Sequence, residues 1–63
     1  MYQTAEYYAE MGQKQGQAAR RGDAAMVAWQ GDLAWRAMQL ETSEDRAVAK
    51  RAEAEGYRAG WGE

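Results

Sequence analysis

The segment Arg20-Arg21-Gly22-Asp23 decides how this chain folds, because it contains the signals that end one helix and start another. Basic residues suit the last turn of a helix, and a Gly takes the left-handed conformation that follows it. Asp23 can cap the next helix by accepting a backbone N–H bond. A second boundary follows at 42–45, where the hydroxyls of Thr and Ser precede two acidic residues. These boundaries predict three helices, at about 4–21, 24–41 and 44–59, and a tail over 60–63 that we expect to fray.

The composition favours helix throughout the chain. Pro, Ile and Phe are absent, and 14 of the 63 residues are Ala. We therefore expect an all-α fold with a single helical domain over 1–63, formed by an antiparallel helical hairpin and a third, looser helix. Only 15 residues are larger hydrophobes, so the core is thin for a domain of this size. Without Cys or His, neither a disulfide nor a structural zinc site can compensate, which leaves self-association or a partner protein.

The middle helix is the most apolar of the three and carries two apolar stripes at helical spacing. We expect it to be the central element, with one stripe covered by the first helix and the other by the third helix or a second subunit. Trp29 shares a stripe with Leu33 and is expected in the core. Trp35 lies at the outer margin of the second stripe, beside the polar face, and is the favoured interface residue.

The other two helices are less apolar. Gly12 and Gly16 lie one turn apart in the first helix, on a strip without bulky side chains, which indicates that something approaches closely there. We expect them to make room for a Trp of the neighbouring helix; the alternative is helix dimerisation, which Gly-x-x-x-Gly indicates in lipid. The third helix is the least hydrophobic, and we expect it to dock loosely.

Several classes of function are disfavoured by the residues that are missing. With no His or Cys, and with aliphatic hydroxyls only at Thr4, Thr42 and Ser43, the chain is predicted not to be an enzyme and to have no cofactor or small-molecule substrate. The carboxylates of residues 41, 44 and 45 lack the spacing of a calcium loop and suit a helix start, so no metal site is predicted. The longest apolar run, 24–29, is far shorter than the ~20 residues that span a bilayer. With no stretch like a signal peptide at its start, the chain is expected to be soluble and cytoplasmic.

Nucleic-acid binding is the alternative function, through a helix-turn-helix around Gly22. Basic residues cluster late in the first helix and again in the third. However, ten acidic residues outnumber eight basic ones and the pI is about 5.1, so a solvated helix face explains these charges better.

Residues from about 5 to 38 resemble a single tetratricopeptide-type helical hairpin. Tyr8, Met11, Gly12, Ala24 and Gly31 match the aromatic, large aliphatic and small positions of that pattern, whereas Gln15, Ala28 and Arg36 depart from it. The resemblance implies binding of peptides or proteins, although such repeats normally occur in arrays of about three. The short Ala-, Arg- and Trp-rich chain, with its closing segment 56–61, also resembles the small accessory proteins of bacteriophages, many of which inhibit a host protein.

The sequence therefore predicts a non-enzymatic protein-interaction module that forms a homodimer, binds a host protein, or both. Trp and Tyr are the residues that most often anchor protein interfaces, and seven of the 63 residues are of these types. Tyr7 and Tyr8 are expected half-buried, with their hydroxyls in water. The residues predicted to bind the partner are Trp35, Tyr7, Tyr8, Met38 and Trp61.

Overall fold

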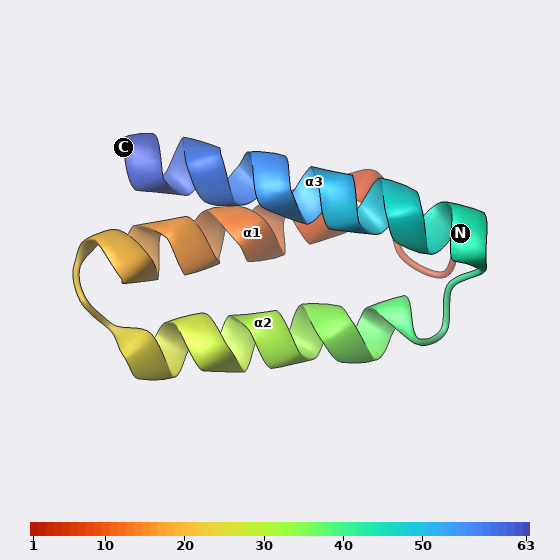
Figure 1. Ribbon diagram of the computed structural model, residues 1–63, viewed down its shortest axis with the longest axis horizontal. Coiled ribbons are helices and arrows are strands. Elements are labelled where there is room, and N and C mark those ends of the chain that lie inside the picture. The colour runs from red at the N-terminus through yellow and green to blue at the C-terminus, as the bar shows by residue number, and fades with distance from the viewer.

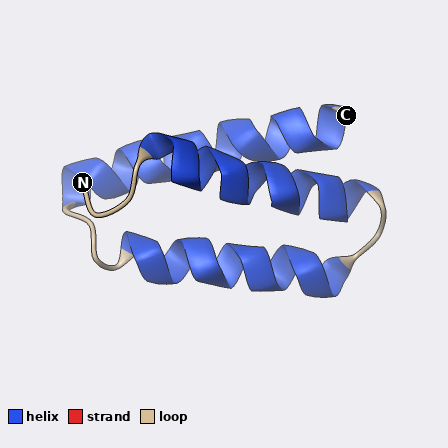
Figure 2. Ribbon diagram, turned by 180° about the vertical axis from the view of Figure 1, so that it is seen from behind, coloured by secondary structure: helices blue, strands red, loops and turns tan.

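Three helices make up the fold in a computed structural model, which describes residues 1–63 (Figure 1). They are α1 (Ala5–Arg20), α2 (Ala24–Met38) and α3 (Ser43–Gly62). The chain turns back on itself twice, so α2 runs antiparallel to both of its neighbours in sequence, and α1 and α3 run parallel side by side (Figures 1 and 2). The predicted all-α, three-helix fold is confirmed.

The predicted boundaries arise from local hydrogen bonds. The side chains of Thr4, Asp23 and Thr42 each accept a bond from the backbone N–H three residues later, which caps the three helices. Gly22 has a φ of 78°, the left-handed conformation that the first turn requires. In the second turn, the Arg46 guanidinium donates to the carbonyl oxygens of Met38 and Glu41, so α2 ends three residues before the predicted position.

The closest packing in the fold is between α1 and α3, where glycines bring the two backbones together. A Cβ at Gly12 would overlap the carbonyl oxygen of Glu53 and lie 2.8 Å from its carbonyl carbon. A Cβ at Gly56 would meet the Ala9 carbonyl in the same way, with its carbon at 2.9 Å. The pattern repeats one turn later at Gly16 and Gly60. Each helix thus contributes one Gly-x-x-x-Gly, and this close approach allows Cα–H groups to contact carbonyl oxygens across the helix pair.

This glycine contact corrects three expectations. Gly12 and Gly16 accommodate the backbone of α3 and not a Trp side chain, so the close approach that they indicate is made by another helix of the same chain. The third helix is not loosely docked, since small residues allow a closer contact than large apolar ones. The tail does not fray: α3 continues to Gly62, where the side-chain amides of Gln13 and Gln17 donate to the Glu63 carboxylate. Arg20 also donates to the Trp61 carbonyl oxygen at 2.9 Å.

The central helix is α1, not α2 as the two apolar stripes predicted. α1 packs against both other helices, whereas α2 and α3 scarcely touch. The buried cluster contains Tyr8 and Met11 of α1, three residues of α2 and Ala49 of α3. Because Tyr8 and Met11 are bulky, they fit against the small Ala34 and Ala37 of α2. The stripe of α2 that contains Trp29 and Leu33 is consequently turned toward the margin of the α1–α2 contact and toward solvent.

Candidate protein-binding surface

The outward face of α2 is the main surface that the fold leaves uncovered. Gln30, Ala34, Ala37 and Met38 are the buried residues of α2, and at 3.6 residues per turn Asp32 lies on the opposite side of the helix. Viewed along the helix axis, Trp29 and Trp35 lie about 60° to either side of Asp32. We call Ala25, Ala28, Trp29, Asp32, Trp35 and Arg36, all exposed, the outward face of α2.

The two indoles of this face keep more than half of their surface exposed. Trp29 is 53% exposed and Trp35 is 60% exposed. Between them the Arg36 Nε donates to the Asp32 Oδ2 at 3.0 Å, one turn apart along the helix. Leu40, 61% exposed, lies just beyond the end of the helix. Large aromatic side chains beside an arginine are the composition that is enriched in protein interfaces.

The position of α2 explains why this face is open. In Figures 1 and 2 α2 forms one edge of the molecule, with α1 between it and most of α3. Because α2 packs on α1 alone, its opposite side has no neighbour within the chain. The expectation that Trp29 belongs to the core is therefore wrong: Tyr8 and Met11 of α1 supply bulky side chains to that contact, and Ala34, Ala37 and Met38 of α2 join them in the buried cluster.

The five residues predicted to bind a partner fall into three groups, exposed, half-buried and buried. Trp35 and Trp61, 52% exposed, are on the surface. Tyr7 is half-buried and packs its ring edge-to-face on Tyr8, with centroids 5.3 Å apart. Tyr8 has no exposed surface and Met38 is 3% exposed, so both are core residues and neither is accessible to a partner. This corrects the expectation that the Tyr8 hydroxyl lies in water.

Trp35 and Trp61 are not brought together. Trp61 lies near the end of α3, at the end of the molecule that holds the α1–α2 turn, whereas Trp35 lies in the half of α2 nearer the α2–α3 turn (Figure 1). Trp61 lines a shallow hollow with Tyr57 and Arg58 on α3 alone. Trp29 was not predicted to lie on the surface. The signal that could have indicated this is the pair of small residues Ala34 and Ala37 on the other side of α2, against which the bulky side chains of α1 fit.

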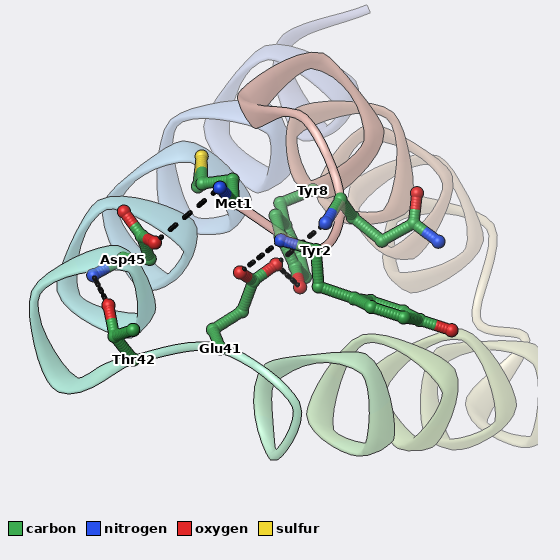
Figure 3. A network of polar contacts seen from close by, with 7 residues as sticks. Met1, Tyr2, Tyr8, Glu41, Thr42 and Asp45 are labelled. Atoms are coloured by element: carbon green, nitrogen blue, oxygen red, sulfur yellow. Dashed lines mark hydrogen bonds and ion pairs between the residues drawn. The ribbon is translucent and has the colours of Figure 1, made fainter.

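A second feature of interest is a buried carboxylate, Glu41, in the α2–α3 turn (Figure 3). Its two oxygens accept the backbone N–H groups of Tyr2 and Gln3, at 2.7 and 2.9 Å, and the Tyr8 hydroxyl at 2.7 Å. The amino group of Met1 lies 3.7 Å from a carboxylate oxygen of Asp45. The N-terminal segment is thereby fastened across the α2–α3 turn.

These hydrogen bonds set the ionisation of both partners. Burial disfavours the charged form of Glu41, but the bonds from Tyr8, Gln3 and Tyr2 together outweigh it and hold the pKa of this carboxylate below its ordinary value. Burial, with the hydrogen bond to Glu41 and its charge, raises the pKa of the Tyr8 phenol. The pair is therefore an ionised acceptor and a neutral donor at neutral pH.

The hydrogen bonds around Glu41 hold the N-terminal segment on the α2–α3 turn, and they leave neither oxygen of this carboxylate free to react with a ligand. Both oxygens of Glu41 are engaged, and neither Glu41 nor Tyr8 lines a surface hollow. No group of three acidic residues comes close enough to hold a metal ion. None of the three helices combines the length and the apolar character that crossing a bilayer requires. The outward face of α2 is thus the strongest candidate for a functional surface.

Comparisons of this chain with models of protein families, with curated proteins and with solved structures find no match.

Proposed function

We propose that this protein is a non-enzymatic protein-interaction module whose binding surface is the outward face of α2. The observation that carries the proposal is the exposure of Trp29 and Trp35 on a helix that has no neighbour on that side. Burial of such aromatic side chains dominates the energetics of many protein interfaces.

The compactness of the single chain supports a binding role for these side chains. Its accessible surface is 4076 Å², close to the ~4,100 Å² expected for a monomeric protein of 7.1 kDa. The single chain is therefore as compact as a typical monomer of its size, and Trp29 and Trp35 keep 53% and 60% of their surface exposed in it. Exposed aromatic residues that the fold does not need are available for recognition.

The resemblance of residues 5–38 to a tetratricopeptide hairpin agrees with protein binding. The proposal extends to a host protein as one possible partner class, because the phage-type accessory proteins that the chain resembles act in that way. An inhibitory role would follow from occupation of that partner's surface.

A nucleic-acid-binding regulator is the second candidate, and it has less support. A helix-turn-helix sets its two helices at about 90–120°, whereas α1 and α2 lie antiparallel along their lengths (Figure 1). The basic side chains are also engaged locally: Lys14 pairs with Glu10, Arg21 with Asp23, and Arg46 with backbone carbonyls. Few cations therefore remain free to contact phosphates.

The proposal can be tested by placing a photoactivatable crosslinking amino acid at Ala28 and, in a matched control, at Glu55. Both positions are exposed, but Ala28 lies on the outward face of α2 and Glu55 lies on α3, away from that face. Position 28 keeps both indoles in place. Irradiation in a cell that expresses the protein should give a protein adduct from position 28 and none from position 55. If position 28 yields no protein adduct, or if both positions yield the same adducts, the outward face of α2 is not a binding surface.

A further inference from the structure

The charges on the outward face of α2 complement those of a second copy of the same helix. Asp32 and Arg36 lie one turn apart near the middle of α2, and both are exposed. In a parallel copy Asp32 would lie opposite the partner's Asp32, which is repulsive. An antiparallel copy centred at Ala34, midway between the two charges, places Asp32 opposite the partner's Arg36 and also Arg36 opposite the partner's Asp32. The antiparallel arrangement also opposes the helix dipoles favourably.

The same antiparallel register gives each indole a partner that suits it. Trp35 is one position from the centre, so the two Trp35 residues of a dimer are offset by about 3 Å along the helix axis and lie on the same side of the interface. They can therefore pack against each other beside the two-fold axis. Trp29 lies on the other side of the interface, toward the partner's Arg36 and Leu40, where its indole can stack against the guanidinium.

The area available is suited to a reversible dimer of folded monomers. With about 250 Å² for a fully exposed Trp, Trp29 and Trp35 together leave roughly 280 Å² uncovered. That is about a third of the ~800 Å² that each partner contributes to a standard interface. The remainder would come from the small and charged residues between the indoles and from Leu40. Such an interface leaves the α1–α3 contact undisturbed, because it lies on the opposite edge of the molecule (Figure 1).

We infer that the protein forms a two-fold symmetric dimer in which the outward faces of α2 pack antiparallel, held by two reciprocal Asp32–Arg36 ion pairs and by Trp35 packed on the partner's Trp35. The inference depends on the proposed function, because it names the occupant of the same surface. It adds to that function the identity of the partner, a second copy of this chain, and the register of contact.

Charge reversal tests the register. In Asp32→Arg all four facing charges are positive, and in Arg36→Asp all are negative, so each variant alone should dimerise about tenfold more weakly or worse. An equimolar mixture of the two variants restores both ion pairs, and a heterodimer about as tight as the wild-type dimer should form. The double variant Asp32→Arg with Arg36→Asp should recover the homodimer. Sedimentation velocity in the micromolar range and native mass spectrometry measure these masses, and circular dichroism checks that each variant folds.

Three results would overturn the inference. They are a wild-type chain that stays monomeric throughout the micromolar range, single variants that dimerise as well as the wild type, and a mixture that does not recover the dimer. A heterodimer much tighter than the wild-type dimer would indicate parallel helices and would also overturn it. The crosslinking experiment separates this failure from that of the proposed function. An adduct of twice the chain mass supports the dimer, an adduct with a foreign protein alone refutes the dimer and leaves the binding function, and no adduct refutes both.

Discussion

Gly56→Ala should destabilise this protein strongly, whereas Gly31→Ala, an identical change in the neighbouring helix, should not. A Cβ at Gly56 would lie 2.9 Å from the Ala9 carbonyl carbon and 3.0 Å from the Gln13 nitrogen, and it would overlap the Ala9 carbonyl oxygen. All these atoms belong to the backbone, so no side-chain rotation relieves the overlap. Ordinary contact begins at 3.4 Å, so α1 and α3 must separate by more than 0.5 Å. A gap of 0.5–1 Å forfeits roughly a quarter to a half of the dispersion energy between facing atoms.

The two changes should therefore have opposite signs. Overpacking costs about 1–3 kcal/mol or more, and the better helix propensity of Ala returns at most ~1 kcal/mol, so Gly56→Ala should lose about 2 kcal/mol. The Gly31 Cβ would meet only the flexible Gln15 side chain at 3.4 Å, so Gly31→Ala should gain roughly 0.5–1 kcal/mol. For a domain of this size, the melting temperature should fall by about 10 °C in Gly56→Ala and rise by about 4 °C in Gly31→Ala.

Thermal and urea unfolding, followed by far-ultraviolet circular dichroism, measures both changes. Gly12→Ala should behave like Gly56→Ala, because its Cβ meets the backbone of Glu53 and Tyr57 in the same way. A Gly56→Ala variant as stable as the wild type would refute the argument that backbone contact holds α3 in place. Equal effects at Gly31 and Gly56 would show that helix propensity, and not the α1–α3 contact, controls the outcome.

Further predictions concern the buried polar groups, the first turn and the surface of α2. Because the folded pKa of Glu41 is lowered, its contribution to stability is present above its ordinary value of 4.5 and is lost as the pH falls through the folded pKa. In acid titrations followed by circular dichroism, Glu41→Gln should be less stable than the wild type at neutral pH and lose less stability below pH 4.5; parallel curves would contradict this. The buried Oε1 of Gln30 has no hydrogen-bond partner, so Gln30→Met should raise stability by about 1 kcal/mol in urea unfolding, and a loss would show that the amide is needed. Gly22→Ala should cost about 1–2 kcal/mol because φ is 78°, and an unchanged unfolding midpoint would count against strain in this turn. Trp29→Ala should lower the monomer's thermal midpoint less than Met38→Ala, which should cost about 2–5 kcal/mol; the reverse order would return Trp29 to the core.

The helix boundaries could be predicted from sequence because each depends on a few adjacent residues. Capping by Asp23 and Thr42, and the left-handed Gly22, need only the local backbone, and all three occur in the fold. Part of the candidate surface was also predictable, since Trp35 stood beside the polar face of its helix. The exposure of Trp29 could not be predicted, because a helical wheel with two apolar stripes does not show which stripe the neighbouring helix covers.

Propensity and capping act over a few residues, so the number of helices, their starts and the absence of strands can be predicted from local sequence. Which helix is central emerges only when the helices pack, because that depends on how well whole faces fit each other. Small residues on α3 let it approach α1 through backbone contact, and small residues on α2 accept Tyr8 and Met11. Glycine and alanine are only weakly hydrophobic, so the hydrophobic pattern of the sequence does not identify these faces as buried. The close fit of the faces nevertheless determines how the helices pack. This packing leaves the indoles of α2 on the surface.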